Sequence, residues 1–305
     1  MREIVLIAKR NSRKGPEAFA EVTKALTARG ISIVEAHQVE GSKELRRRVK
    51  RAVKSGHKFI AVAGGDGSQS AAVGAMAYTD AVLAVIPAGT GNSFIQSLGI
   101  EPTIDAAIET ILNGTVEKVD LGMVNGHYFA NFATIGLSAE IGLETPKLLK
   151  KIAGGVAYGL SAVVPMLKKQ PFRAKVAWER NALRVETFQM IVASGRYFGN
   201  TPILPDATVT SGRLAFFTTA GVGRLEVMRM YLAFLAGTQT ALPDAHYFQA
   251  KKIKITTKVR QRIALDGSDF GFTPAKFEVA PDALRVLVPH KIAKGDDPGK
   301  GDDVA

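Results

Sequence analysis

The sequence predicts an α/β domain, with a parallel sheet covered by helices on both faces, followed by a mainly antiparallel β-sandwich domain. Two patterns predict this order. Apolar runs of strand length alternate with helical patterns through the first 120 residues, whereas strand-like runs dominate the rest of the chain. A length of 305 residues accommodates two domains of ordinary size.

The expected strands of the first domain are apolar on both faces, which is typical of a parallel sheet buried on both sides. Gly30 is expected to close the first helix, and Thr103 to cap the last one. In chain order we expect strand Glu3–Ala8, helix Pro16–Ala28, strand Ile31–Ala36, helix Lys43–Ser55, strand Phe59–Ala63, helix Gln69–Ala77, strand Ala81–Ile86 and helix Ile104–Leu112.

The second domain is expected to consist mostly of strands joined by loops, with two helical patterns, Val156–Lys168 and Gly223–Ala236, between them. We expect domain bounds of 1–121 and 122–290 and a disordered tail over 291–305. The last strand, near 283–290, is free to return to the first domain. The expected strands are His127–Thr134, Phe172–Trp178, Ala182–Ala193, Arg213–Ala220, Phe248–Thr256, Gln261–Leu265 and Ala283–Val288.

The composition is that of a globular protein, with 46% hydrophobic and 22% charged residues. Cysteine is absent, which excludes disulfides, cysteine nucleophiles and thiolate metal sites. The N-terminus lacks the pattern of a signal peptide, because its apolar run is only as long as a strand. The sequence therefore predicts a cytoplasmic protein.

The net charge of +12 favours a polyanionic partner. A basic cluster over 43–54 is most simply a solvated helix face, and no zinc spacing or basic-aromatic strip favours nucleic acid. The apolar stretch Gly154–Leu167, flanked by lysines, is either a core helix or a helix that docks on anionic lipid. We expect peripheral association with an anionic membrane and no specific nucleic acid. A homodimer stays open.

Two glycine-rich loops follow consecutive expected strands, where ligands bind in open parallel sheets. The first, Gly64–Ser68, offers backbone N–H groups to phosphate oxygens with no side chain in the way. Asp66 within it repels a bare phosphate but suits a bridging Mg²⁺. The second loop offers Gly89, Thr90, Gly91 and Asn92 before a helix start.

Either loop alone is equally well explained as a simple turn, and only the pair indicates a nucleotide site. The sequence contains no GxxxxGK[ST] and no GxGxxG, which argues against a P-loop enzyme and a dinucleotide-binding dehydrogenase. The absence of GxSxG weakens a hydrolase interpretation.

Four motifs then occur in order: GGDGS at 64–68, PAGTGN at 87–92, VDLG at 119–122 and LDG at 265–267. Together they resemble the catalytic domain of the diacylglycerol kinase family, which includes sphingosine and ceramide kinases and bacterial lipid kinases. GGDG alone does not separate this family from NAD kinases and phosphofructokinases, whereas PAGTGN and the late LDG favour the lipid kinases.

The resemblance implies transfer of the γ-phosphoryl group of ATP, with Mg²⁺, to a hydroxyl of diacylglycerol or a related lipid at a membrane surface. It implies an active site in the cleft between the domains. On matching positions, Asp66 is implied in catalysis and metal binding, Asp120 in the magnesium network, and Asp266 as general base. The implied nucleotide contacts are Asn11, Gly64, Gly65, Gly67, Ser68, Thr90 and Asn92.

Three serines depart from the acidic residues usual in diacylglycerol kinases. Ser93 removes an outer magnesium carboxylate, Ser211 puts a structural metal site in doubt, and Ser268 replaces the glutamate of Asp-Gly-Glu. Two alternatives therefore stay open: a kinase of a soluble substrate, similar to NAD kinases, and a lipid- or nucleotide-binding protein with weak catalysis. The sequence identifies neither the lipid, nor the effect of the serines, nor the regulation.

Overall fold

The computed structural model describes residues 2–10, 15–89, 91–144, 170–199, 201–204, 206–220 and 223–290. Within them the chain forms two compact units. The first runs to Val119 and takes in the last described stretch from Asp282, and the second is Asp120–Pro281. The expected helix over 156–168 and the expected disordered tail lie outside the described residues.

The first unit contains alternating strands and helices around a parallel sheet. Its strand order is β2-β1-β3-β4-β18, and all four neighbouring pairs are parallel. The elements are β1 (Glu3–Lys9), α1 (Gly15–Ala28), β2 (Ser32–Val39), α2 (Ser42–Lys54), β3 (Phe59–Gly64), α3 (Asp66–Met76), β4 (Val82–Pro87), α4 (Ser93–Ser97), α5 (Ile104–Asn113) and the end of β18 (Ala275–Val288).

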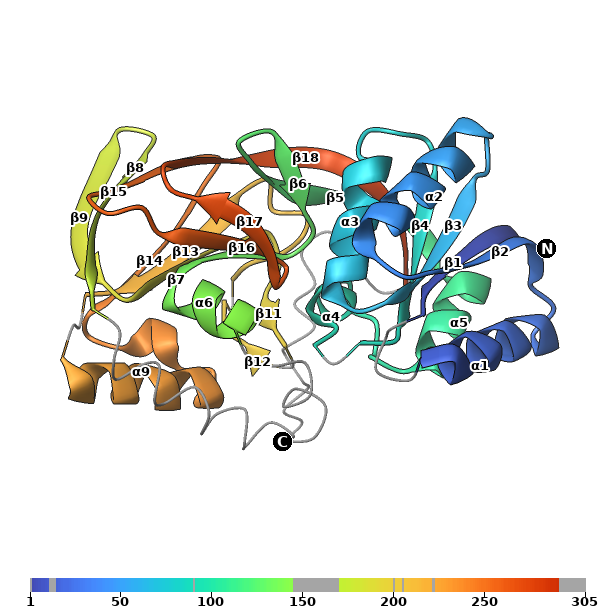
Figure 1. The fold of residues 1–305 in the computed structure, drawn as a ribbon, viewed down its shortest axis with the longest axis horizontal. Helices are drawn as coiled ribbons and strands as arrows, with labels where there is room; N and C mark the ends of the chain where they lie inside the picture. Colours follow the sequence, from blue (N-terminus) through green and yellow to red (C-terminus); the bar gives the residue numbers. More distant parts are fainter. Residues whose placement is uncertain are drawn as a thin grey trace, which may run out of the picture. The chain divides into compact units, whose positions relative to one another are not determined.

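Helices cover both faces of this sheet, as the sequence predicts (Figure 1). Because successive strand side chains point to opposite faces, Ile4 and Leu6 of β1 pack with α1 and α5, where Leu26 and Ile108 are buried. The alternate residues of β1 are equally buried on the face covered by α2 and α3. Apolar residues on both faces of the strands therefore fix a three-layer unit.

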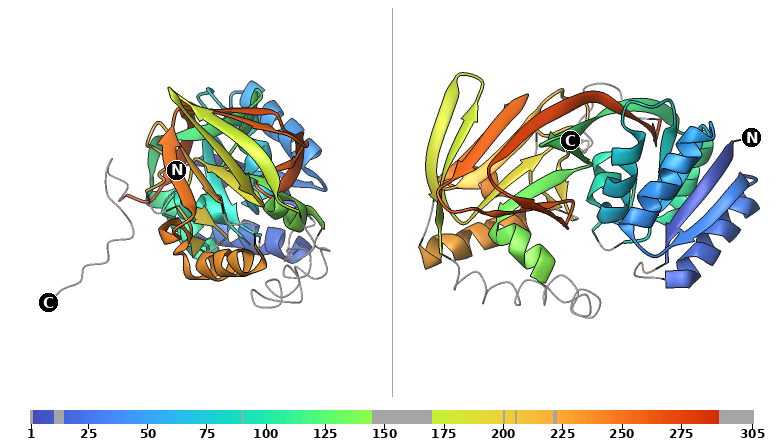
Figure 2. Two further views of the ribbon diagram at one scale, coloured as in Figure 1. Left: turned by 90° about the vertical axis from the view of Figure 1, so that its left-hand side faces the viewer. Right: turned by 45° about the horizontal axis from the view of Figure 1, so that its top comes forward.

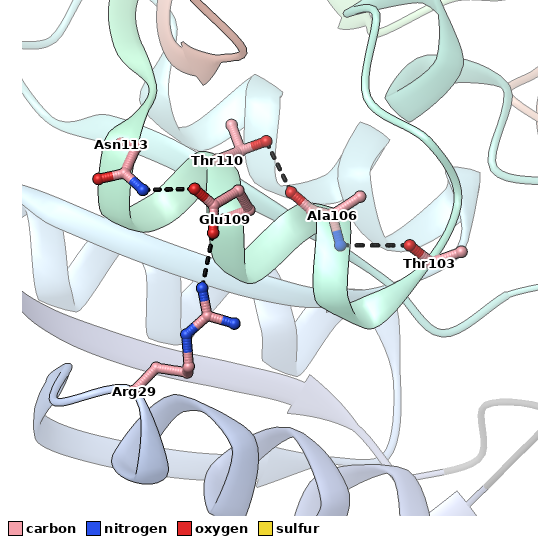
Figure 3. A network of polar contacts seen from close by, with 6 residues as sticks. All are labelled: Arg29, Thr103, Ala106, Glu109, Thr110 and Asn113. Atoms are coloured by element: carbon pink, nitrogen blue, oxygen red, sulfur yellow. Dashed lines mark hydrogen bonds and ion pairs between the residues drawn. The ribbon is translucent and has the colours of Figure 1, made fainter.

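Helix α5 shows how local polar contacts set the ends of a helix (Figure 3). The Thr103 hydroxyl accepts a hydrogen bond from the Ala106 amide at 3.2 Å, which confirms the predicted N-cap. Arg29 at the end of α1 donates to Glu109 at 2.6 Å, and Asn113 donates to the same carboxylate. These contacts join α5 to α1 on one face of the sheet.

The second unit is a sandwich of two largely antiparallel layers. One layer contains β18-β15-β8-β9, and the other has the order β14-β13-β10-β7-β16-β17. The elements are β5 (Thr115–Val124), β6 (His127–Phe129), β7 (Phe132–Gly136), α6 (Leu137–Glu144), β8 (Phe172–Trp178), β9 (Asn181–Thr187), β10 (Gln189–Ala193), β11 (Tyr197–Phe198), β12 (Thr201–Pro202), β13 (Leu214–Thr219), α9 (Arg224–Ala236), η1 (Gln239–Ala241), β14 (Ala245–Ala250), β15 (Lys252–Thr257), β16 (Arg262–Leu265) and β17 (Ser268–Phe272).

An apolar core fills the space between the two layers. Val176 and Ile255 from the first layer meet Ile135, Val192 and Phe216 from the second. The left-hand view of Figure 2 looks onto the β8–β9 hairpin, drawn in yellow-green, at the outside of the first layer. The predicted fold class, a parallel α/β domain followed by an antiparallel β-sandwich, is confirmed.

Three expected strands are each two strands in the structure. The expected strand 182–193 breaks at Phe188 into β9 and β10, which pair in different layers. The expected strand 248–256 breaks at Lys251 in the same way, into β14 and β15, and 127–134 is β6 and β7. At Phe188 and at Lys251 a single residue connects a strand of one layer to a strand of the other. Because no turn residues interrupt the sequence there, the pattern predicts one continuous strand.

The remaining differences concern elements that the sequence pattern does not announce. Strand β18 is one long strand whose start pairs with β15 and whose end pairs with β4. Strands β5, β11, β12 and β17 and helix α6 have no predicted counterpart. No helix in the described part of the chain has the length and apolar content needed to cross a bilayer.

Candidate functional site

The two predicted phosphate loops lie side by side at the carboxyl ends of neighbouring strands. Gly64 of β3 pairs with Pro87 of β4, and the Ala88 amide donates to the Gly64 carbonyl at 3.1 Å. The first loop leads at once into α3, whose N-cap is Gly65 and has no side-chain cap. The Ser68 and Gln69 amides donate to the Gly65 carbonyl at 2.8 and 3.1 Å. The amides of Asp66 and Gly67, at the very start of α3, have no intrahelical acceptor, which makes this helix start suitable for an anion.

The glycines are required because the two loops touch through their backbones. A Cβ atom on Gly89 would lie 2.3 Å from the Cα of Gly65, and one on Gly91 would lie 2.7 Å from Oδ2 of Asp66. A Cβ atom on Gly64 would lie 2.4 Å from Oγ of Ser68, which is buried. No side chain larger than hydrogen fits at these positions without displacing the other loop or its neighbours.

The Asp66 carboxylate ties the first loop to the start of α4. Its Oδ2 accepts a hydrogen bond from the Ser93 hydroxyl at 3.2 Å, and its Oδ1 accepts one from the Phe94 amide at 3.1 Å. Burial raises the pKa of the Asp66 carboxyl above its ordinary value of 3.8, against the opposing effect of the hydrogen bonds from Phe94 and Ser93. Ser93 is fully buried and serves as a partner of Asp66.

The second loop contains a buried polar group without a partner. Asn92 adopts a left-handed backbone with φ of 50° and precedes α4. Its amide nitrogen donates to the Gly89 carbonyl at 3.3 Å, while its Oδ1 is buried and accepts no hydrogen bond from the described residues. A buried acceptor of this kind is suited to a cation or a donor that comes with a ligand.

The raised pKa of Asp66 gives a first testable prediction. Between pH 3.8 and the raised native value, the folded protein holds a proton that the unfolded chain has lost, so stability falls as pH rises through this window. The variant Asp66→Asn has no charge to bury. Its side chain can still accept a hydrogen bond from the Phe94 amide and donate one to the Ser93 hydroxyl. We expect the variant to gain stability relative to the wild type as pH rises from acid to neutral.

Urea unfolding of both proteins over a pH series measures this difference. A difference in the free energy of unfolding that stays constant from acid to neutral pH would show that burial does not raise the Asp66 pKa. Glu109→Gln serves as the control, because the pKa of Glu109 is lowered by its hydrogen bonds from Asn113 and Arg29. That variant should lose stability relative to the wild type over the same rise in pH.

Asn11 and Thr90, both predicted nucleotide contacts, lie outside the described residues. Of the other predicted contacts, Gly64, Gly65, Gly67 and Ser68 belong to the first loop. Gly89, Gly91 and Asn92 belong to the second. The structure therefore brings the described members of both loops together in the first unit.

Asp266 occupies the two-residue turn between β16 and β17 in the second unit. Asp266 and Gly267 have positive φ angles of 46° and 76°, as a type I′ hairpin turn requires. The Asp266 carboxylate is buried, with 3% exposure. Its Oδ2 accepts from the Ala130 amide at 2.7 Å, and its Oδ1 accepts from the amides of Asn131 and Phe132, both at 3.0 Å.

Asp266 accepts hydrogen bonds from residues 130–132, which connect β6 to β7. The same segment also forms hydrogen bonds with residues 194 and 197. Ser194 donates through its hydroxyl to the Ala130 carbonyl at 3.0 Å, and the Asn131 side chain donates to the Tyr197 carbonyl at 2.6 Å. The Phe132 and Phe198 rings lie 4.6 Å apart between centroids. Three consecutive amides that turn toward one carboxylate leave no sequence signal, so sequence reasoning misses this role of Ala130, Asn131 and Phe132.

Asp120 is a second buried carboxylate of the same unit. Its Oδ2 accepts from the Gly212 amide at 2.6 Å, and its own amide donates to the Val209 carbonyl at 2.6 Å. Ser211 closes the neighbouring turn by exchanging hydrogen bonds with the Arg213 backbone. Among the described residues, no three His, Cys, Asp or Glu side chains gather as a metal site would need.

Two models of known protein families match the chain. The diacylglycerol kinase catalytic domain matches residues 3–124, and the YegS C-terminal NAD kinase beta sandwich-like domain matches residues 133–288. The first match ends at the last residue of β5, and the second begins inside β7. The resemblance carried by the four sequence motifs is thus confirmed over most of the described chain.

Proteins named diacylglycerol kinase are among the relatives. The one from Bacillus subtilis is 26% identical over 294 residues, covering 93% of this chain and 96% of the relative. The one from Staphylococcus epidermidis is 26% identical over 280 residues, covering 91% and 87%.

Solved structures support the fold. The crystal structure of a diacylglycerol kinase from Bacillus anthracis superposes with a TM-score of 0.73 at 21% identity, covering 94% of this chain and 97% of that one. A second solved chain from that organism reaches a TM-score of 0.81 at 22% identity, covering 94% and 95%. With both family models matched in chain order, the protein belongs to the diacylglycerol kinase family and is a lipid kinase, a phosphotransferase that acts on an alcohol group.

Proposed function

We propose that the protein transfers the γ-phosphoryl group of ATP, with Mg²⁺, to a hydroxyl of diacylglycerol or a closely related lipid. Family membership supports ATP as the phosphoryl donor, and the names of the relatives support diacylglycerol as the acceptor. The observation that carries the proposal is the backbone contact between the loops that contain Gly65 and Gly89, beside the uncapped start of α3.

The first unit would bind the nucleotide. Phosphate oxygens need donors that a backbone can supply without steric hindrance, and the glycines of the two loops offer such N–H groups. We assign the nucleotide contacts to both loops and extend them to Asn11 and Thr90 on the family resemblance. The lack of a side-chain cap on α3 would leave the amides of Asp66 and Gly67, at its start, to the phosphates.

The residues of the two loops also fit a divalent cation. A carboxylate whose pKa is raised by burial is stabilised by a nearby positive charge, and the unpartnered Oδ1 of Asn92 adds a neutral oxygen ligand. Asp66 would hold Mg²⁺, with Asp120 supporting the network. When bound, Mg²⁺ offsets the negative charge on the phosphoryl group in transfer.

Asp266 would accept the proton of the lipid hydroxyl as the oxygen attacks the γ-phosphorus and ADP leaves. A lipid hydroxyl is a poor nucleophile, so a carboxylate that takes its proton lowers the barrier. The amides of Ala130, Asn131 and Phe132 hold this carboxylate in one orientation.

The serines that replace acidic residues are compatible with activity. Ser93 donates to Asp66, a place where a second carboxylate would add like-charge repulsion beside a buried carboxylate. Ser268 is exposed and pairs with Leu265 in the hairpin, two residues along the chain from Asp266. We therefore propose an active enzyme and not a binding protein that has lost turnover.

A panel of acceptors in mixed micelles with ATP and Mg²⁺ tests this function. The panel contains diacylglycerol, a sphingoid base, ceramide and phosphatidylglycerol, with NAD in a separate aqueous assay. We expect phosphate in the lipid extract with diacylglycerol or a close relative as the best acceptor, and no formation of NADP. Turnover with NAD and none with any lipid would replace the lipid kinase by a kinase of a soluble substrate.

A further inference from the structure

The outward face of the β9-β8-β15-β18 layer carries basic residues on every strand. Side chains alternate along these strands, so that Ala174, Val176, Ile253 and Ile255 are buried in the sandwich. The exposed positions between the buried ones include Lys175, Arg184, Lys254 and Lys276, which we call the cationic stripe. Figure 2, in its left-hand view, faces the β8–β9 part of this surface.

Strand register places these cations directly against one another. Lys175 of β8 is the partner of Arg184 of β9, and Lys254 of β15 is the partner of Lys276 of β18. Lys254 pairs with Ala177, so Lys254 and Lys175 are diagonal neighbours across β15 and β8. Like charges directly opposite in a sheet are destabilising, so folding alone does not explain this arrangement.

Few acids compensate the stripe. Glu186 forms an ion pair with Arg173 at 3.4 Å, and Glu278 forms one with Lys252 at 3.5 Å. Each of these carboxylates is therefore already paired with a basic residue outside the stripe. Among the ion pairs of the residues that the structure describes, none includes a member of the stripe. Its positive charge is therefore available to an anionic partner.

Two exposed apolar side chains belong to the segments that follow β15 and end β17. The Lys258 amide donates to the Arg173 carbonyl, so the following residue, Val259, lies near the start of β8. Val259 is 66% exposed, and Phe272, at the end of β17, is 49% exposed. The hydroxyls of Thr257 and Thr273 hydrogen-bond to each other and join the two segments. Cations with adjacent exposed apolar groups are typical of surfaces that bind an anionic bilayer.

We infer that the cationic stripe, together with Val259 and Phe272, is the surface by which this protein docks on an anionic lipid bilayer. The inference rests on the proposed function, because a lipid acceptor is reached at a bilayer surface. The cations would lie over anionic headgroups, and the two apolar side chains would enter the interface between headgroups and acyl chains. Of the five described residues other than Phe272 that make up this surface, none is aromatic, and Arg260 lies over one face of the Phe272 ring at 5.3 Å, which disfavours base stacking with nucleic acid.

Vesicle sedimentation with matched variants tests the inference. The stripe variant Lys175→Gln/Lys254→Gln and the helix variant Lys50→Gln/Arg51→Gln, on α2, each remove two positive charges. Each charge near an anionic surface contributes about fivefold to partitioning, so the stripe variant should bind phosphatidylglycerol-containing vesicles roughly thirtyfold more weakly. The helix variant should stay close to the wild type. Val259→Ser/Phe272→Ser should weaken binding even at high salt, where charge is screened.

Two further readouts separate docking from folding and from chemistry. The stripe variant should melt at the same temperature as the wild type or higher, because it relieves like-charge repulsion. It should also phosphorylate water-soluble dioctanoylglycerol at the wild-type rate. A wild type that binds anionic vesicles through the stripe but leaves dioctanoylglycerol unphosphorylated would support the docking surface and overturn the proposed function instead.

The inference fails if the stripe variant binds anionic vesicles as the wild type does. It fails equally if the helix variant loses as much binding, because net charge alone would then explain the affinity. Tighter binding of the wild type to duplex DNA or RNA than to anionic vesicles, lost in the stripe variant, would assign the surface to nucleic acid.

Discussion

Gly89→Ala should reduce phosphoryl transfer by at least about a hundredfold, because displacing a substrate-binding loop by about 1 Å is enough for a loss of this size. The added methyl group would lie 2.3 Å from the Cα and 3.0 Å from the nitrogen of Gly65. Both are backbone atoms, so the loops must separate. Overpacking of this kind costs about 1–3 kcal/mol of stability. Steady-state kinetics with ATP and thermal unfolding of the same preparation measure the two effects.

Gly74→Ala, on helix α3, is the matched control. A Cβ atom on Gly74 would have no atom within 4 Å, and alanine is the better helix former. We expect a gain of about 0.5–1 kcal/mol in stability with unchanged turnover. If Gly89→Ala kept wild-type turnover while Gly74→Ala behaved as expected, the contact between the loops would have no part in catalysis.

Asp266→Asn should reduce turnover by about 10²–10⁴-fold, the usual contribution of a general base. It should also destabilise the protein, because the amide nitrogen of the new side chain cannot accept from all three backbone donors. With Asn Oδ1 facing Asn131 and Phe132, its NH₂ group would face the Ala130 amide, which now donates to Oδ2 from 2.7 Å. A buried donor left unsatisfied costs about 1–3 kcal/mol.

Two measurements distinguish the base from a purely structural carboxylate. The folded fraction of Asp266→Asn comes from its unfolding curve, and its affinity for Mg²⁺-ATP reports on the loops of the first unit. If the base assignment holds, folded Asp266→Asn binds the nucleotide but transfers almost no phosphate. Activity that merely follows the folded fraction would make Asp266 a residue that positions the loop at 130–132 and nothing more.

Asp269→Asn provides the control carboxylate on the same hairpin. Asp269 is exposed and forms a two-pronged ion pair with Arg262, at 3.1 and 2.9 Å, which holds the pKa of Asp269 below its ordinary value. Because water screens this pair, its loss should cost only about 0.2–1 kcal/mol and leave turnover unchanged. Equal losses of activity in both variants would indicate general damage to the hairpin.

The layout of the first unit could be predicted because its determinants are local in the sequence. Apolar strands of six or so residues, helix caps such as Thr103 and glycines at loop positions each mark one element. The second unit was predicted less well, because the sequence keeps its β propensity where the chain passes from one layer to the other. The only local sign is a shift in the apolar alternation: Val185 and Met190 both point into the core across the corner at Phe188, as Ala250 and Ile253 do across Lys251.

The adjacency of the two glycine-rich loops was predictable from the sequence, but the contacts between them were not. The spacing of glycines after two strands indicated adjacent loops, whereas the contact between Gly65 and Gly89 and the hydrogen bond from Ser93 to Asp66 depend on how β3 and β4 pair. In the same way, LDG predicted a turn with a carboxylate, but its three amide partners come from a segment 134–136 positions earlier in the chain. Long-range partners of this kind have no signature in a single sequence.

Titration of the purified wild type with ATP in a calorimeter, with Mg²⁺ and then with a chelator, examines the basis of the whole proposal. We expect saturable binding with Mg²⁺, a marked loss of affinity without it, and no binding by Gly89→Ala. Heat of binding that is the same with and without Mg²⁺, or that Gly89→Ala leaves unchanged, would mean that the paired loops and Asp66 do not hold the phosphates of the nucleotide.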